Sequence, residues 1–288
     1  MASRPLALVK GAGDLATGVG LRLFRSGFDV VMTDIAAPTP VRRTVAFAEA
    51  VWDGEAVVEG VTGVRVATAA EATRALAERR IPVLVDPEAA VRAELRPLVV
   101  VDAIVAKRNL GTRMSDAQAV IALGPGFVAG VDVHAVIETM RGHTLGRVIL
   151  EGEAIPNTGV PGEIGGRGAE RVLRAPVTGR FEPIAVIGDR VKAGDVVARV
   201  GGEPVAASID GVLRGLLRAG LEVTPGFKVG DVDPRAEPSH CFTVSDKALA
   251  VGGGVLEAAA HLLGGIRFVQ ESRADRGGGG DEQTQERC

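Results

Sequence analysis

The sequence contains few aromatic residues and few cysteines. Its 288 residues include no Tyr, one Trp and eight Phe, and the two cysteines, Cys241 and Cys288, are far apart. Two isolated cysteines form neither a disulfide framework nor a zinc site. So few aromatic side chains favour backbone-lined sites over stacking platforms. The formal net charge of -3 provides no basic footprint for a nucleic acid partner.

Long hydrophobic runs are also absent. No apolar run reaches the roughly 18 residues needed to span a bilayer. Residues 1–5 lead directly into an apolar run and lack the layout of a signal peptide. We therefore expect a soluble, cytoplasmic protein that binds neither nucleic acid nor membrane. The chain length suggests two domains, and 46% hydrophobic residues suffice for packed cores.

Glycine is abundant, and the first glycine cluster follows the first apolar run. Residues 10–18 read KGAGDLATG, between apolar residues 6–9 and an amphipathic stretch that ends at Arg25. This order predicts a strand, a tight turn and a helix. Gly11, Gly13 and Ala16 match the G-x-G-x-x-A fingerprint of dinucleotide-binding folds, in which the N–H groups at the helix start bind phosphate. The alternative is a glycine turn kept for packing alone.

Two acidic residues bear on the ligand of this turn. Asp34 ends the next apolar run, 21 residues after Gly13, which is where an acid holds a ribose hydroxyl in dinucleotide sites. Asp14 places a negative charge where a pyrophosphate would lie. Its side chain is therefore either the N-cap of the helix or a ligand of a cation that bridges to phosphate.

Residues up to about 150 alternate between strand-like and helix-like segments, which predicts a parallel α/β sheet. The expected strands are residues 6–9, 29–33, 83–85, 98–101, 119–123 and 147–150, and the expected helices are residues 15–25, 69–80, 87–95 and 134–141. His134, Glu138 and Arg141 would share one face of the last helix. That face is either a partial metal site or, as we expect, a solvated surface.

Charged residues and a second glycine turn follow the predicted strand ends, where doubly wound sheets bind ligands. Basic side chains there can neutralise an anion, and the second turn can form another backbone wall; ordinary surface charges and a ligand-free turn are the alternative. With the first turn and Asp34, these residues form the predicted ligand-binding site, without a metal site or identified catalytic residues. Its members are Lys10, Gly11, Gly13, Asp14, Asp34, Arg42, Arg43, Asp102, Lys107, Gly124 and Gly126.

An internal repeat occupies the region from about residue 175 to 231. Residues 175–181 (APVTGRF) return as residues 207–213 (ASIDGVL), 32 residues later. The same offset relates Gly188, Val191 and Gly194 to Gly220, Val223 and Gly226. A period of this size indicates duplicated supersecondary units. Because each copy has short β-like runs between glycine turns, we expect a small all-β barrel or sandwich.

Residues 175–179 and 188–197 resemble a biotinyl/lipoyl-type domain, which implies a barrel of two intertwined halves. Carrier domains of this type bear their modified lysine on the hairpin between the halves. Here that hairpin, residues 201–204, reads GGEP, and Lys192 and Lys228 lie in other turns. We therefore expect no biotin or lipoate attachment, and a barrel used for docking or for shaping a site.

The predicted fold class is α/β, with a Rossmann-like parallel sheet domain at residues 1–151 and the duplicated all-β barrel at residues 171–236. A Gly/Pro-rich connector, residues 152–170, joins them as a mobile linker or as an ordered loop. Residues 237–266 form a helical segment expected to return to the first domain, and residues 267–288 a disordered tail. The glycines at 252–254 weaken that helix unless close packing requires them.

The whole arrangement resembles the accessory proteins of the selenium-dependent molybdenum hydroxylase system, relatives of xanthine dehydrogenase maturation factors. The resemblance spans residues 5 to about 264 and is carried by residues 10–18, 40–43, 45–47, 102–107 and 124–127 and by Arg235. It implies a role in maturing or inserting the molybdenum cofactor, a hydroxylase partner and a molybdopterin-type ligand.

Two other classes stay open. An NAD(P)-dependent oxidoreductase uses the same first turn, although the sequence offers no convincing proton-transfer residue. A non-catalytic docking protein would use the barrel face and bind no small ligand. The oligomeric state also stays open, a homo-oligomer included.

Overall fold

The computed structural model describes residues 4–160 and 162–265. The strands of its main sheet are β1 (Leu6–Lys10), β2 (Asp29–Asp34), β3 (Glu55–Val58), β4 (Val61–Val66), β5 (Ile81–Val85), β6 (Val99–Asp102), β7 (Ala119–Leu123), β9 (Ala135–Ile137) and β10 (Val148–Ile149). The α-helices are α1 (Asp14–Arg25), α2 (Ala50–Asp53), α3 (Ala69–Ala77), α4 (Arg92–Leu95) and α5 (Asp246–Leu262). Short 3-10 helices are η1 (Arg43–Val45), η2 (Phe47–Glu49), η3 (Met114–Asp116), η4 (Ala169–Arg171) and η5 (Pro238–Cys241).

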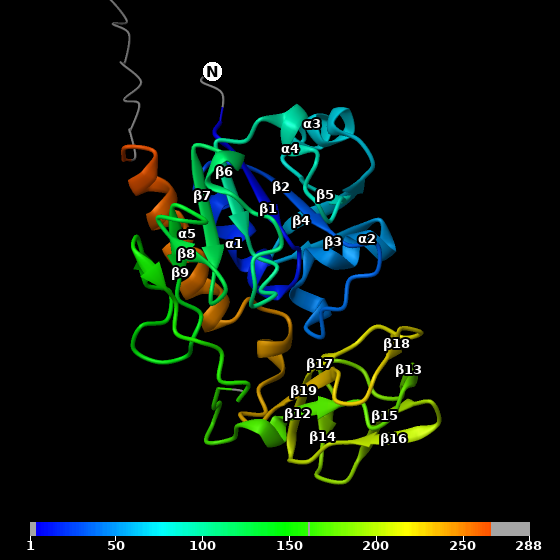
Figure 1. Ribbon diagram of the computed structural model, residues 1–288. Coiled ribbons are helices and arrows are strands. Elements are labelled where there is room, and N and C mark those ends of the chain that lie inside the picture. The colour runs from blue at the N-terminus through cyan, green and yellow to red at the C-terminus, as the bar shows by residue number, and fades with distance from the viewer. Residues whose placement is uncertain (1–3, 161, 266–288) are drawn as a thin grey trace, which may run out of the picture.

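The nine strands are ordered β10-β9-β7-β6-β1-β2-β5-β4-β3 (Figure 1). Neighbours from β9 to β4 pair in parallel, whereas β10 and β3 pair antiparallel at the two edges. The prediction of an α/β sheet domain is confirmed at this level, although the sheet is mixed. The antiparallel hairpin of β3 and β4 has no counterpart in the strands expected from the sequence.

The central strands are continuous apolar runs because helices cover both faces of the sheet. In β1, Ala7 and Val9 pack in the core that includes residues of α1 and α5. Leu8, between them, packs in the opposite core with Ala72 and Ala75 of α3. The alternation of side chains along a strand therefore divides β1 between two cores.

Helix α5 packs against α1 through glycine (Figure 1). A Cβ atom at Gly18 of α1 would lie 2.7 Å from Cβ of Ala248, and one at Gly252 of α5 would lie 2.9 Å from the carbonyl oxygen of Gly18. Ser245 caps the helix by accepting a hydrogen bond of 3.1 Å from the N–H of Ala248. The C-terminal helix thus returns to the first domain, and Gly252 is there for close packing.

The helix expected at residues 134–141 is wrong: residues 135–137 form strand β9, and no helix is present in this range. All three residues of β9 are fully buried, and Val136 and Ile137 are β-branched, so pairing between β7 and β10 outweighs the apparent helical period. The expected helix at residues 87–95 shortens to the four residues of α4. His134, Glu138 and Arg141 therefore do not share a helical face.

The duplicated region forms two four-stranded antiparallel sheets, ordered β12-β19-β17-β14 and β16-β15-β13-β18 (Figure 1). Strands β13, β14 and β15 correspond to β17, β18 and β19 at an offset of 32 residues. Repeat-related strands take the same places in the two sheets, which confirms the internal repeat. Among the described residues no strand ladder joins the two sheets, so the all-β barrel that was expected is not shown. The strands of the two sheets are β12 (Val172–Arg174), β13 (Gly179–Pro183), β14 (Arg190–Val191), β15 (Val196–Val200), β16 (Glu203–Ala206), β17 (Gly211–Leu216), β18 (Glu222–Val223) and β19 (Lys228–Asp233).

The segment before η1 attaches the duplicated unit to the main sheet domain. The N–H of Leu216 donates a 2.7 Å hydrogen bond to the carbonyl of Val41, and Val41 packs against the core of the duplicated unit. A Cβ atom at Gly215 would lie 3.0 Å from that carbonyl oxygen. Arg218 adds ion pairs to Glu49 at 2.8 Å and to Asp53 at 2.5 Å.

The connector contains β11 (Gly152–Glu153), which pairs with β8 (Val128–Ala129). Within the two described ranges, no helix has both the length and the apolar character needed to cross a membrane. The predicted disordered tail, residues 267–288, lies outside the described residues.

Candidate ligand-binding site: two adjoining cavities

The order of the main sheet reverses beside β1, because the chain proceeds through β2 and β5 on one side and returns as β6 on the other. A cavity of about 640 Å³ lies beyond the carboxyl ends of these strands, where doubly wound sheets bind ligands. We call it the glycine-turn cavity. Its lining comprises Gly11, Gly13, Asp14, Leu15, Ala16, Thr33, Asp34, Ile35, Pro38, Thr39, Pro40, Pro87, Glu88, Ala103, Ile104, Val105 and Leu110.

Gly11 and Gly13 of the first turn differ in backbone conformation and in the space around them. Gly11 has φ +94°, and a Cβ atom there would lie 3.0 Å from the carbonyl oxygen of Ala103. Gly13 is the N-cap of α1 with φ -66°, and a Cβ atom there would meet no described atom within 4 Å. The space in front of Gly13 is therefore open to the cavity. The first N–H groups of α1 lack intrahelical acceptors, and no side chain of the described residues caps them.

Asp34 fixes the shape of this turn. Its carboxylate accepts hydrogen bonds of 2.8 Å from the N–H of Ala12 and 2.8 Å from the N–H of Ile35. Burial raises the pKa of Asp34, and these two N–H donors oppose that shift. A carboxylate has about four lone-pair sites, so Asp34 keeps the capacity to accept a hydrogen bond from a ligand.

Lys10 and Asp102 do not line the glycine-turn cavity, nor do they line a second cavity that lies beside the duplicated unit. The Lys10 ammonium donates to Thr112 Oγ1 at 2.7 Å and lies 3.5 Å from Asp102 Oδ2, and the Thr112 hydroxyl donates to the same carboxylate at 2.5 Å. All three side chains are buried. The charges of Lys10 and Asp102 compensate each other between β1 and β6, and the Thr112 hydroxyl bridges the two groups.

The second glycine turn also packs against protein. A Cβ atom at Gly126 would lie 2.5 Å from the backbone nitrogen of Arg108, and one at Gly124 would lie 2.5 Å from Thr139 Oγ1. Neither glycine lines the two cavities. Arg43 faces the duplicated unit, where it donates to the carbonyl of Leu216 at 2.9 Å.

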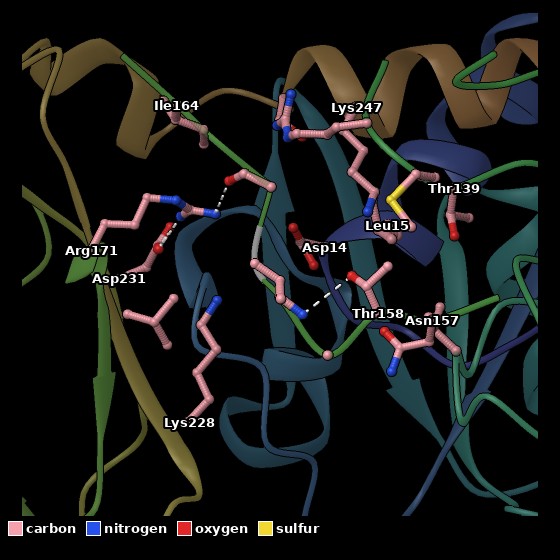
Figure 2. A pocket seen from close by; sticks show the side chains of 18 of the residues that line it. Asp14, Leu15, Thr139, Asn157, Thr158, Ile164, Arg171, Lys228, Asp231 and Lys247 are labelled. Carbon is pink, nitrogen blue, oxygen red and sulfur yellow. Dashed lines mark hydrogen bonds and ion pairs between the residues drawn. The ribbon is translucent and has the colours of Figure 1, made fainter. Parts of the chain in front are cut away.

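A second cavity, of about 520 Å³, lies between α1, the connector, α5 and the duplicated unit (Figure 2). We call it the basic cavity. Two predicted site residues, Arg42 and Lys107, line it, and Asp14 borders both cavities. Its charged lining comprises the bases Arg42, Lys107, Arg141, Arg171, Arg174, Arg214, Lys228 and Lys247 and the acids Asp14 and Asp231.

Most of these basic residues were missed in the sequence because they lie more than 100 residues from the glycine turn. Arg171 follows the connector, Arg214 lies on β17, and Lys247 lies in the first turn of α5. Burial lowers the pKa of Lys247, and the nearby charge of Arg141 lowers it further. No local pattern marks these residues, since the packing of the duplicated unit and the return of α5 bring them together.

Asp14 is not the N-cap of α1, because Gly13 holds that position. The Asp14 carboxylate instead lies 3.7 Å from Nη1 of the buried Arg42.

The partial metal site considered at Glu138 is not formed, because the Glu138 carboxylate accepts hydrogen bonds from the N–H groups of Met140 and Ile155. In residues 4–160 and 162–265, no three or more His, Cys, Asp or Glu residues are grouped as a metal site.

No protein-family model matches the chain. An Escherichia coli K12 protein described as "Uncharacterized protein YqeB" is 53% identical over 267 residues, which cover 92% of this chain and 49% of that protein. The chain thus spans about half the length of this relative.

Similar solved structures have 13–15% sequence identity and TM-scores of 0.24–0.25. One is an aspartoacylase family protein of Mesorhizobium loti (TM-score 0.25; 82% of this chain, 87% of that one). Another is the ectoine utilization protein EutE (DoeB) of Ruegeria pomeroyi, and a third is a succinylglutamate desuccinylase/aspartoacylase of Rhodobacter sphaeroides; both have a TM-score of 0.24 and cover 80% of this chain and 85% of theirs. Scores this low support no transfer of fold or activity.

None of the comparisons bears out the family suggested by the sequence. The described structural matches are of the aspartoacylase and desuccinylase type, and none is an accessory protein of a molybdenum hydroxylase. The predicted role in molybdenum cofactor maturation is corrected accordingly. Neither the oxidoreductase nor the docking protein gains support from the matches.

Proposed function

We propose that this chain binds a small phosphate-bearing molecule in the glycine-turn cavity. The observation that carries the proposal is the open space in front of Gly13, at the uncapped start of α1. Uncapped N–H groups at a helix start attract a phosphate through hydrogen bonding and through the helix dipole. The cavity lies at the carboxyl ends of β1 and β6, where the strand order reverses.

The rest of the lining suits the less polar part of a nucleotide-like ligand. Ile35, Ile104 and Leu110 line the cavity while 36–47% exposed, and Pro38 and Pro40 add apolar surface. Ligand sites commonly combine such apolar walls with a few well-placed polar groups. Asp34 is the group placed to accept a hydrogen bond from a ligand hydroxyl.

The test is nucleotide binding by the Gly13→Val variant. Because no described atom lies within 4 Å of a Cβ atom at Gly13, the fold should tolerate the substitution while the side chain blocks phosphate approach. A matched control is Gly253→Val, since Gly253 also has no described neighbour within 4 Å of a Cβ atom. We expect at least one member of a panel of nucleoside phosphates to bind the wild type and the control, and not Gly13→Val. Equal affinity in a folded Gly13→Val protein contradicts the proposal.

We also propose that residues 171–236 fold as one barrel-like module, inserted between the sheet domain (residues 1–151) and the returning segment (residues 237–266). The module has its own core around Phe181, Leu213 and Leu216, which supports this division. Limited proteolysis should cut first in the connector, residues 152–170. If the protease cuts inside the main sheet or inside the duplicated unit before it cuts the connector, these boundaries are wrong.

A further inference from the structure

We infer that the basic cavity is a binding site for a small oxyanion with two or more negative charges, such as a phosphate or a polycarboxylate. This site is distinct from the glycine-turn cavity, although Asp14, Leu15 and Val105 border both. The inference does not depend on the proposed function.

Three buried arginines around this cavity have unsatisfied hydrogen-bond donors. Nε of Arg42, Arg171 and Arg214, and Nη1 of Arg42, have no hydrogen-bond partner among the described residues. The three side chains are only 7%, 9% and 4% exposed, respectively. Buried polar groups are nearly always hydrogen-bonded, and a buried charged donor without an acceptor destabilises the protein. Three such arginines around one cavity therefore provide donors for an anionic acceptor.

Other contacts hold each guanidinium in position. Arg42 donates through Nη2 to the carbonyls of His240 (3.0 Å) and Thr243 (3.1 Å). Arg171 pairs with Asp231 (Figure 2), and Arg214 lies 3.4 Å from Asp233. These anchors fix the arginines at the cavity wall, so binding an anion would require little further ordering of side chains.

The cavity also carries an excess of positive charge. Eight basic and two acidic side chains line it. Two of the eight bases, Arg141 and Arg214, are paired with acids outside the lining, Asp246 and Asp233. Lys228 and Lys247 make no ion pair in the described part of the chain, and Figure 2 shows them entering from opposite walls. The nearby charge of Arg42 adds to burial in lowering the pKa of Arg214. Repulsion of this kind is relieved by a bound anion.

The chemistry of the donors selects an oxyanion. Arginine presents a rigid fork of N–H groups that matches the oxygens of phosphate and carboxylate. Two flexible lysines can adjust to the remaining oxygens. Because several cations face one small space, a ligand with more than one negative charge compensates them better than a monoanion does.

The experiment measures binding of pyrophosphate and of citrate to the full chain by calorimetry. Lys228→Gln and Lys247→Gln remove charge without touching the buried arginine anchors. Lys192→Gln is the matched control, because Lys192 is exposed on the duplicated unit and lines neither cavity. We expect saturable binding of at least one probe, weakened about tenfold by either cavity variant and unchanged by the control.

The same titration on Gly13→Val separates this site from the glycine-turn cavity. Retained binding in Gly13→Val, with loss in Lys228→Gln and Lys247→Gln, supports the inference even if no nucleotide binds. Tighter binding of pyrophosphate than of citrate would identify a phosphate ligand, and the reverse a polycarboxylate. Absence of saturable binding by both probes, or equal weakening by Lys192→Gln, would overturn the inference.

Discussion

The carboxylate of Asp14 lies 3.7 Å from Nη1 of Arg42, and this ion pair stands where the two cavities meet. Asp14 is about one-third exposed, whereas Arg42 is buried. The pair links the first turn of α1 to the segment that attaches the duplicated unit. It also supplies one of the two negative charges that the described residues contribute to the lining of the basic cavity.

Replacing Asp14 with Asn should strengthen binding of pyrophosphate in the basic cavity. The carboxylate partly neutralises Arg42 and thereby competes with the anion. Partly exposed ion pairs are worth about 0.2–1 kcal/mol, which corresponds to a gain in affinity of up to about fivefold. Glu203→Gln, at an exposed hairpin, is the charge-matched control in the same titration. Weaker binding by Asp14→Asn would show that Asp14 does not oppose the anion.

Adjacent glycines of α5 should respond in opposite ways to alanine. A Cβ atom at Gly252 would lie 2.8 Å from Cγ of Arg22 and 2.9 Å from the carbonyl oxygen of Gly18, whereas one at Gly253 meets nothing within 4 Å. We expect Gly252→Ala to lower the free energy of unfolding by about 1–3 kcal/mol through overpacking. Gly253→Ala should raise it by about 0.5–1 kcal/mol through helix propensity. Urea denaturation measures both, and equal effects would rule out close packing of α1 on α5.

The buried pair of Lys10 and Asp102 should be worth more to stability than to binding. Removing one partner leaves an uncompensated buried charge, so Asp102→Asn should lower the free energy of unfolding by about 3–5 kcal/mol. The double variant Lys10→Met/Asp102→Asn should recover part of this loss. Chemical denaturation of the single and double variants forms the test. A stable Asp102→Asn protein that fails to bind its ligand would instead assign this pair to the site.

The affinity of the basic cavity for sulfate should fall as pH rises toward 10.5, the unperturbed pKa of lysine. The folded-state pKa of Lys247 lies below 10.5, mainly because of burial, so Lys247 loses its charge before a free lysine does. Without an anion, the unfolded chain binds more protons in that window, and the free energy of unfolding therefore rises with pH there. Sulfate does not titrate in this range. Lys247→Gln should flatten the pH profile, and an unchanged profile would exclude Lys247.

The sequence was informative wherever local chemistry determines structure. The glycine turn, α1, the central strands and the repeat follow from apolar runs, turn residues and a fixed period. Prediction failed at residues 134–141, where burial between two strands outweighed a helical pattern. The fully buried Ala135–Ile137 shows why, because β pairing depends on neighbours distant in sequence.

The site was predictable only in part, because it too is built from residues that are distant in sequence. Gly11, Gly13 and Asp34 follow one another at expected spacings and line one cavity. Lys10 and Asp102 were expected there on equal grounds, but they pair with each other across two adjacent strands. Arg171 and Arg214 could not be found from spacing, since they reach the basic cavity from the connector end and the duplicated unit.

Phosphate binding in front of Gly13 is best tested by mass analysis of small molecules released by denaturing the purified wild type and Gly13→Val proteins, together with thermal shifts in nucleotides. Stabilisation should follow nucleotide concentration as mass action requires. We expect a phosphate-bearing molecule, or a nucleotide-dependent shift, in the wild type that Gly13→Val loses. Release of a molecule without phosphate, or the same result from both proteins, would contradict phosphate binding at Gly13.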